Sequence, residues 1–577
     1  MTAAELREKI LETVSRNGGH LASSLGAVEL CMALAESFEP ERDRIVWDVG
    51  HQTYAWKLLT GRLERFGTLR QLGGVSGFPN PAESKSDAAV AGHAGVAISI
   101  AEGYAAARRL TGENYHVVAV TGDSSLVNGT SLEALNNCAA AGKVIVVLND
   151  NGMSISKPAG SFSRFLGRTI AGARYNRVKN LARRFGRALR LYFLYSAAHR
   201  FKGRIKSLFL ADAYFAQFGF RYLGPVDGHD VKALKTVFEV AKEEQRSVLI
   251  HVVTKKGKGF APAEKDPTAW HGTGPFDLRS PEPPAPNGET WSDAFGAALC
   301  RAARKDRRVV ALTAGMKDGT GLAAFAKEFP GRFFDVGIAE GHMVAFAAGL
   351  AAAGLKPVVA VYSTFLQRAI DQVMHDACIS SLPVVFCIDR AGLVGADGVT
   401  HQGLYDIPML RALPNMAIAQ PRDAADLEML LGEALGRSGP TAIRYPRGKV
   451  PPAAKPEATP ETGRPAFAIW STGDWLWKAE AVAATLGGTA VHARYIKPLD
   501  EELLARQRQD GVPVVSLENG SLAGGFGEAL AADLRLGWPD EFIPHGKPEE
   551  LERRYGLDVE SVTARVKDFI GNRGKKQ

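Results

Sequence analysis

Two short apolar runs that end in polar residues constrain the fold of this 577-residue chain more than any other feature. The run 116–120 leads into Gly122-Asp123, and the run 144–148 leads into Asn149-Asp150-Asn151. The segment between them, 124–142, has the leucine and small-residue spacing of a helix. This order predicts a strand, a helix and a second strand parallel to the first.

The polar residues after these strands predict a metal and anion site. Ligands of open α/β sheets bind beyond the carboxyl ends of the strands, so Asp123 and Asn151 are expected to lie close together. One carboxylate, one amide and backbone carbonyls suit Mg²⁺, and the helix after Asp123 offers N–H groups to a diphosphate. A plain strand–helix–strand unit with polar strand ends would have the same residues, so the motif alone leaves both interpretations open.

The composition predicts a folded protein of several domains. At 577 residues, with 46% hydrophobic and 23% charged residues, about two to four domains are expected. No apolar run reaches the length of about 18 residues that a membrane helix needs, and the N-terminus lacks the pattern of a secretory signal. Five cysteines without metal-type spacing fit reduced thiols. Together these features predict a cytoplasmic protein.

Two proline-rich segments, 280–288 and 451–463, have the composition of linkers. They divide the chain into domains at 1–279, 290–449 and 464–577, each of which alternates strand-like and helix-like segments. The predicted fold class is α/β, with three α/β domains and mostly parallel sheets. Further strands are expected at 247–253, 309–312, 333–336, 358–362, 384–388, 467–470, 490–496 and 512–517.

A basic insertion interrupts the first domain at about residues 160–210. Between Arg164 and Lys206 there are thirteen Lys or Arg residues and no acidic residue. Interleaved aromatic and leucine residues would suit an amphipathic surface for lipid headgroups or nucleic acid. We favour a solvated helical excursion near a site that handles phosphates, because charge runs are usually solvated. Nucleic acid is therefore not expected as a partner, and peripheral membrane contact through 164–206 is the less favoured alternative.

A set of further motifs resembles the 1-deoxy-D-xylulose-5-phosphate synthase family of transketolase-like thiamine-diphosphate enzymes. The pattern from Gly122-Asp123 to Asn151 resembles the diphosphate and Mg²⁺ signature of these enzymes. Each motif is weak alone, but together they follow the family's order over nearly the whole chain. The motifs lie at 18–23 (GGHLAS), 47–52 (WDVGHQ), 92–93 (GH), 223–230 (LGPVDGHD), 263–267 (AEKDP), 338–340 (IAE), 362–368 (YSTFLQR), 388–392 (IDRAG), 395–403 (GADGVTHQG) and 444–448 (RYPRG).

The resemblance implies a transketolase-like fold, a homodimer, and thiamine diphosphate and Mg²⁺ as cofactors. The implied reaction joins pyruvate, with loss of CO₂, to D-glyceraldehyde 3-phosphate. Its product is 1-deoxy-D-xylulose 5-phosphate, and the reaction is the first step of the non-mevalonate isoprenoid pathway. Contacts to the pyrimidine ring are expected from the second domain and contacts to the diphosphate from the first, so the resemblance places the cofactor at a domain interface.

The resemblance also assigns residues to the metal and the cofactor. Mg²⁺ is expected on Asp123, Asn151 and the main-chain carbonyl of Met153. Glu340 is expected to exchange a proton with the pyrimidine ring, although an acid in a first helical turn also has a purely structural interpretation. Phe365 is expected to stack on that ring. The remaining cofactor contacts are expected from His51, His93, Ala94, Gly95, Gly122, Ser124, Ser125 and Phe260.

Four histidines in matching motifs, His20, His51, His93 and His401, are expected as catalytic proton donors around the reacting atoms. His271 is a further candidate. Arginines would bind the phosphate of the aldehyde substrate, because a guanidinium gives permanently charged, bidentate recognition. The expected substrate-binding set is His20, Tyr362, Arg368, Arg390, Asp397, His401 and Arg447.

Several positions depart from the family's pattern. Ser124 stands where a Gly is usual, Ala94-Gly95 replace two small hydroxyl residues, Phe260 replaces a Tyr, and Gly341 replaces a Gln. Because these changes lie around the expected cofactor, two alternatives remain open. One is a paralogous carboligase or transketolase with a different donor or acceptor. The other is a catalytically silent paralogue with a basic membrane- or nucleic-acid-binding segment, against which the presence of Glu340 and of the metal-binding residues argues.

Overall fold

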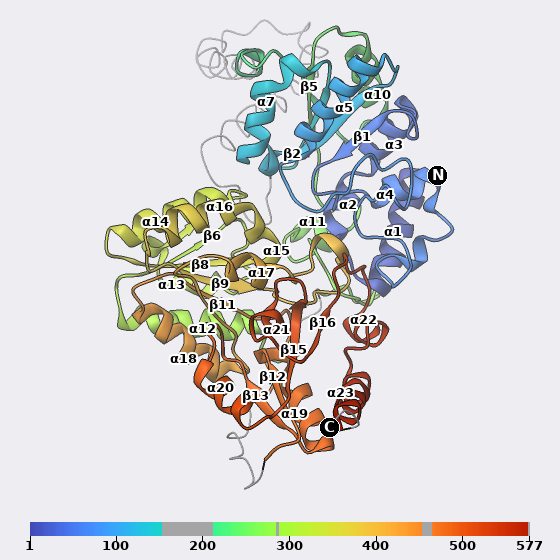
Figure 1. Ribbon diagram of the computed structural model, residues 1–577. Coiled ribbons are helices and arrows are strands. Elements are labelled where there is room, and N and C mark those ends of the chain that lie inside the picture. The colour runs from blue at the N-terminus through green and yellow to red at the C-terminus, as the bar shows by residue number, and fades with distance from the viewer. Residues whose placement is uncertain (153–211, 284–287, 453–463, 575–577) are drawn as a thin grey trace, which may run out of the picture. The chain divides into compact units, whose positions relative to one another are not determined.

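Figure 1 shows the computed structural model, which describes residues 1–152, 212–283, 288–452 and 464–574. The chain forms two compact units, Met1–Pro284 and Ala285–Gln577, and each is described by itself. Met153 and the basic segment 164–206 lie outside the described residues. Among the described ranges, no helix is long and apolar enough to cross a membrane.

The first unit is built on a five-stranded parallel sheet with the order β1-β2-β3-β5-β4. The predicted strand–helix–strand is β2, α7 and β3, and Gly122 pairs with Asn149 where the two strands end. Helices cover both faces: Val118 and Val120 of β2 pack with α1, α3 and α10, whereas Val117 and Ala119 pack with α5 and α7. The elements are α1 (Ala3–Asn17), α2 (Leu21–Gly26), α3 (Val28–Ser37), β1 (Arg44–Trp47), α4 (Tyr54–Lys57), η1 (Leu58–Arg62), η2 (Phe66–Thr68), α5 (Ala97–Thr111), β2 (Val117–Gly122), α6 (Asp123–Leu126), α7 (Gly129–Ala141), β3 (Ile145–Asp150), β4 (Arg221–Asp227), α10 (Val231–Glu243), β5 (Val248–Val253) and α11 (Ala261–Lys265).

The second unit begins with a seven-stranded sheet of the order β14-β10-β11-β9-β8-β6-β7. Figure 1 shows α14 and α12 on opposite sides of this sheet. Val310 and Leu312 of β6 pack with α14, and Val309 and Ala311 pack with α12. The elements up to β11 are α12 (Trp291–Lys305), β6 (Val309–Thr313), α13 (Ala323–Glu328), η3 (Pro330–Arg332), β7 (Phe333–Asp335), α14 (Glu340–Ala352), β8 (Lys356–Tyr362), α15 (Ser363–Leu366), η4 (Gln367–Ala369), α16 (Ile370–Gln372), η5 (Val373–Cys378), β9 (Val385–Asp389), η6 (Gly398–Thr400), α17 (Asp406–Arg411), β10 (Ala417–Ala419), α18 (Ala424–Gly436) and β11 (Thr441–Arg444).

The rest of the second unit forms a four-stranded parallel sheet with the order β13-β12-β15-β16. Every strand pair in the described sheets is parallel except β10 with β14, so the prediction of mostly parallel α/β sheets is confirmed. The elements are β12 (Ala468–Ser471), η7 (Gly473–Trp475), α19 (Leu476–Leu486), β13 (Thr489–His492), β14 (Tyr495–Lys497), α20 (Glu501–Gln509), β15 (Val514–Ser521), α21 (Phe526–Ala529), β16 (Leu534–Trp538), α22 (Pro548–Arg554) and α23 (Val559–Gly574).

The prediction of one strand at 490–496 is wrong, because this segment belongs to two sheets. β13 pairs with β12, whereas β14 pairs antiparallel with β10 of the seven-stranded sheet. The chain changes sheets at Ala493-Arg494, where Ala493 N–H donates to Ser471 and the Arg494 carbonyl accepts from Gln420 N–H. An apolar run does not reveal which sheet supplies its partner, so the sequence pattern could not detect this change.

Candidate active site

The ends of β2 and β3 hold the expected metal residues. Asp123 is the first residue of α6 and only 4% exposed, and Asn151 directly follows β3. Burial and the nearby Asp150 carboxylate both raise the pKa of Asp123. A buried carboxyl beside a second acid is a position where a bound cation is stabilising, so the residues present fit Mg²⁺.

Asp150 has a structural role next to this position. Its carboxylate contacts His251 Nε2 at 3.0 Å and accepts from Gly152 N–H at 2.9 Å. Within the described ranges, no group of three or more His, Cys, Asp and Glu side chains is placed to hold a metal ion. The expected set of Asp123, Asn151 and the Met153 carbonyl contains only one residue of those four types, and Met153 lies outside the described residues.

A lysine that no sequence motif indicated, Lys256, lies beside Asp123. Lys256 is 6% exposed, and burial lowers its pKa to about 8, against the opposing effect of the Asp123 carboxylate. It belongs to the glycine-rich basic run Lys255 to Gly259, which was the available signal. A buried ammonium at this position adds positive charge where a diphosphate is expected.

The expected diphosphate residues surround the start of α6. Gly122 precedes the helix, and Ser124 and Ser125 form its first turn. Ser124 Oγ is buried and has no hydrogen-bond partner within the described residues, so it is available to a ligand. Phe260, by contrast, packs edge-on against Trp270, with ring centroids 5.3 Å apart, and belongs with Phe276 to the periphery of the core.

Three histidine rings of the first unit lie together. The centroid distances are 5.9 Å between His20 and His51, 5.6 Å between His20 and His271, and 5.2 Å between His51 and His271. Phe78 packs against His20 at 5.3 Å. Two of the predicted proton donors are therefore neighbours, and His271 completes their cluster.

The turn Ala94-Gly95, which follows the partly buried His93, is held by a buried acid. Asp48 accepts from Gly95 N–H with both oxygens, at 2.8 and 3.0 Å, and from Ala97 N–H at 3.4 Å. Gly95 has a φ of 87°, and a Cβ there would lie 2.5 Å from Asn128 Oδ1. Only glycine fits this turn without strain, so its backbone N–H groups have a defined direction.

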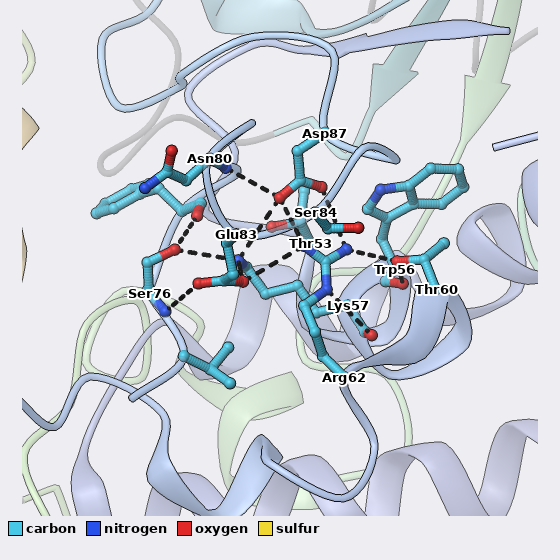
Figure 2. Close-up of polar contacts among 12 residues, drawn as sticks. Thr53, Trp56, Lys57, Thr60, Arg62, Ser76, Asn80, Glu83, Ser84 and Asp87 are labelled. Carbon is cyan, nitrogen blue, oxygen red and sulfur yellow. Dashed lines mark hydrogen bonds and ion pairs between the residues drawn. The ribbon is translucent and has the colours of Figure 1, made fainter. Parts of the chain in front are cut away.

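A buried ion network holds the loop 76–87, which precedes His93 in the sequence; Figure 2 shows the network. Lys57 Nζ donates to Glu83 at 2.6 Å, and Arg62 Nη1 donates to Asp87 at 2.6 Å. Lys57 is fully buried and Arg62 is 4% exposed. Glu83 and Asp87 also accept from the backbone N–H groups of Ser76 and Asn80. The network therefore ties the loop 76–87 to the segment α4–η1.

Replacing Lys57 with Met should lower the free energy of unfolding by about 3 kcal/mol, because the change leaves Glu83 buried without its closest cation. Urea unfolding monitored by circular dichroism measures this loss. Lys235→Met is the matched control, since Lys235 pairs with Glu36 on the surface and should contribute less than about 1 kcal/mol. Equal effects of the two changes would contradict the assignment of the network as a structural anchor.

In the second unit, Glu340 begins α14 and is 3% exposed. Its Oε2 has no hydrogen-bond partner within the described residues, and Arg368 Nη1 lies 3.6 Å from it. Burial raises the pKa of Glu340, and Arg368 opposes that shift. A buried carboxyl with an available oxygen fits the ring nitrogen of a pyrimidine. Arg368, predicted as a substrate residue, is placed beside this acid.

The other expected residues of the second unit lie around Tyr362. The Tyr362 and Phe365 rings stack with centroids 5.6 Å apart, and His401 packs edge-on against Phe365 at 5.6 Å. The Arg390 guanidinium lies 3.6 Å from the Tyr362 ring centroid, and its Nη1 donates to the Gly319 carbonyl at 2.9 Å. Arg447 pairs with Asp397 at 3.2 Å. Burial raises the pKa of Tyr362, and Arg447 and Asp397 are close enough to act on it with smaller, opposite effects. The structure thus gathers six of the predicted residues, namely Tyr362, Phe365, Arg390, Asp397, His401 and Arg447.

Three family models match the chain. They are described as 1-deoxy-D-xylulose-5-phosphate synthase (residues 1–254), transketolase, pyrimidine binding domain (288–452), and transketolase, C-terminal domain (464–562). A Campylobacter jejuni transketolase structure is 19% identical, with 98% of both chains covered and a TM-score of 0.45, a similarity too low to support a conclusion. The pyrimidine-binding match spans Glu340 and Phe365, and the chain is accordingly a transketolase-like transferase that uses thiamine diphosphate and a divalent metal, Mg²⁺.

Two relatives indicate which family within this class the chain belongs to. The 1-deoxy-D-xylulose-5-phosphate synthase 1 of Geobacter metallireducens is 46% identical, covering 98% of this chain and 96% of the relative. The 1-deoxy-D-xylulose-5-phosphate synthase 2 of Geobacter sulfurreducens is 47% identical, covering 98% and 95%. The chain belongs to the 1-deoxy-D-xylulose-5-phosphate synthase family.

Proposed function

We propose that this chain condenses pyruvate, with loss of CO₂, and D-glyceraldehyde 3-phosphate to 1-deoxy-D-xylulose 5-phosphate, the first step of the non-mevalonate isoprenoid pathway. The observation that carries the proposal is the match of nearly the whole chain to synthases of this name at 46–47% identity. The buried, available carboxyl of Glu340 supports it, because a silent paralogue has no use for a group that is costly to bury.

The residues of the first unit would bind the cofactor and the metal. Mg²⁺ would be held by Asp123, Asn151 and the Met153 carbonyl. Thiamine diphosphate, when bound, supplies the nucleophilic carbon and the electron sink for decarboxylation. His20 and His51 would hold protons near the reacting atoms. The further cofactor contacts would come from His93, Ala94, Gly95, Gly122, Ser124, Ser125 and Phe260.

The residues of the second unit would exchange protons and bind the aldehyde. Glu340 would hold or release a proton at the pyrimidine ring, and Phe365 would pack against that ring. Arg390 and Arg447 would bind the phosphate, since both carry a permanent charge and Arg390 is held in place by Tyr362 and Gly319. Asp397 and His401 would contact the hydroxyl and carbonyl oxygens of the substrate.

The assembly and the domain limits are also part of this proposal. We propose a cytoplasmic homodimer without a nucleic-acid partner, with domains at 1–279, 290–449 and 464–577. The contact of β14 with β10 supports a close association of the second and third of these domains. Analytical ultracentrifugation of the purified protein measures the oligomeric state.

Product identification by mass spectrometry tests the activity. With thiamine diphosphate, Mg²⁺, pyruvate and D-glyceraldehyde 3-phosphate, the protein should release CO₂ and form a five-carbon deoxyketose phosphate. A parallel incubation in which a ketose phosphate replaces pyruvate tests the transketolase alternative. Absence of CO₂ release from the pyruvate mixture, or product formation only from the ketose phosphate, would refute the proposed donor.

A further inference from the structure

The loop 390–403 begins with Arg390 and also carries Asp397 and His401. Its two ends pair with each other, since Gly392 N–H donates to the Gly403 carbonyl at 2.6 Å and Gly403 N–H donates back at 2.8 Å. Gln402 Oε1 accepts from the N–H groups of Val394 and Gly395 at 2.8 and 3.1 Å. These contacts close the loop on itself, and its second half is attached to the rest of the unit by Gln402 Nε2, which donates to the Pro544 carbonyl at 3.1 Å, and by the Thr400 carbonyl, which accepts from Thr364 Oγ1 at 2.8 Å.

Asn519 of β15 supplies an attachment at the start of the loop. Its Oδ1 accepts from Leu393 N–H at 3.0 Å and from Trp538 Nε1 at 3.0 Å. Its Nδ2 donates to Asp474 Oδ2 at 2.7 Å, and its own carbonyl accepts from Arg444 at 3.1 Å. Asn519 is 4% exposed, so these bonds are shielded from water and hold the side chain in one orientation.

Glycines at three positions bring the loop backbone close to the C-terminal part of the unit. A Cβ at Gly392, where φ is 79°, would lie 2.3 Å from Asn519 Nδ2. A Cβ at Gly395 would lie 2.9 Å from the Gly546 carbonyl, and one at Gly398 would lie 3.0 Å from His545 Cβ. The close contact at Gly392 leaves the loop no room to shift toward β15.

Arg390 stands two residues before this contact in an uncommon backbone conformation, with a φ of 57°. Such a conformation persists only where the surroundings enforce it. Arg390 directly follows β9 in the chain. After Arg390, the backbone is attached by two hydrogen bonds: Ala391 N–H donates to the Tyr445 carbonyl, and Leu393 N–H donates to Asn519. The direction of the Arg390 guanidinium therefore depends on β9 before it and on these two hydrogen bonds after it.

We propose that Asn519 is a positioning residue that fixes the loop 390–403, so that Arg390 meets the phosphate of an aldehyde phosphate in a single orientation. The inference rests on the proposed function for the identity of that substrate. It assigns a role in substrate recognition to the C-terminal part of the chain, which carries none of the predicted site residues.

Asn519→Leu tests the proposal, since it removes the acceptor of Leu393 N–H while keeping the branching and the number of heavy atoms of the side chain. We expect KM for D-glyceraldehyde 3-phosphate to rise at least about tenfold, with KM for pyruvate and the affinity for thiamine diphosphate within about twofold of wild type. Activity with unphosphorylated D-glyceraldehyde should stay within about twofold, because that substrate gains nothing from Arg390. Hydrogen exchange of the peptide that contains Leu393 should become faster in the protein without substrate.

Trp538→Phe is the matched control, because it removes the other donor to the same Asn519 oxygen without touching the loop. It should leave KM for the aldehyde phosphate and the exchange at Leu393 unchanged, because the bond to Asp474 still orients the Asn519 amide. Gly392→Ala disturbs the contact between the loop and Asn519 from the loop side. It serves as the test of the proposal if Asn519→Leu does not fold. An unchanged KM in both Asn519→Leu and Gly392→Ala, or an equal rise in Trp538→Phe, overturns the proposal. A wild-type protein inactive on this substrate pair overturns the proposed function instead, and the exchange at Leu393 then decides whether Asn519 anchors the loop.

Discussion

Replacing Glu340 with Gln should lower kcat by about 10²–10⁴-fold while the protein stays folded. Gln has nearly the same shape but cannot exchange a proton with a pyrimidine ring. No described group is hydrogen-bonded to the buried Oε2 of Glu340, so no neighbour is placed to exchange the proton in its stead. CO₂ release from pyruvate in the presence of D-glyceraldehyde 3-phosphate measures the loss, and thermal unfolding measures the retained fold.

Glu328→Gln is the control for Glu340→Gln, because it also removes one carboxylate from the second unit. Glu328 lies in α13 and pairs with Arg304 on the surface. Its replacement should leave kcat within about twofold, since exposed ion pairs contribute little. Full activity of Glu340→Gln would refute the assigned proton-exchange role, even if the protein proves to be a synthase.

Replacing Asp123 with Asn should weaken Mg²⁺-dependent binding of thiamine diphosphate by more than about 100-fold, because the change removes the charged oxygen of the metal set. The protein without metal should be as stable as wild type or more stable. Burial and Asp150 disfavour the Asp123 carboxylate, and this cost disappears with a neutral amide. Titration calorimetry with and without Mg²⁺ measures the first effect, and thermal unfolding in chelator measures the second.

Ser124→Gly provides the comparison for Asp123→Asn at the adjacent position. Ser124 Oγ makes no hydrogen bond within the described residues, so its removal costs no internal contact. Cofactor affinity should fall by no more than about tenfold, because a single hydrogen bond from this hydroxyl to the cofactor contributes about 1 kcal/mol. Undiminished Mg²⁺-dependent binding by Asp123→Asn would show that the metal lies elsewhere, and an unchanged affinity in Ser124→Gly would remove the hydroxyl from the proposed cofactor contacts.

The local pattern of the sequence determined most of the secondary structure. It also determined which residues lie at the ends of the strands and helices. The runs 116–120 and 144–148 appear as β2 and β3, with Asp123 and Asn151 directly after them. Glu340 starts α14 as the sequence pattern indicated, and Tyr362 and Phe365 stack because they lie three residues apart at the end of β8. Such features depend on residues near one another in the chain, where the periods of strand and helix are visible.

The tertiary structure alone decided which distant residues meet. His271 joins His20 and His51, Lys256 lies beside Asp123, and Asn519 holds a loop 126 residues away in the chain. The split of the segment 490–496 between two sheets is of the same kind. Periodicity specifies which face of an element is buried but not which element covers it. That choice depends on the order of strands in the sheets, which arises from packing across the whole unit.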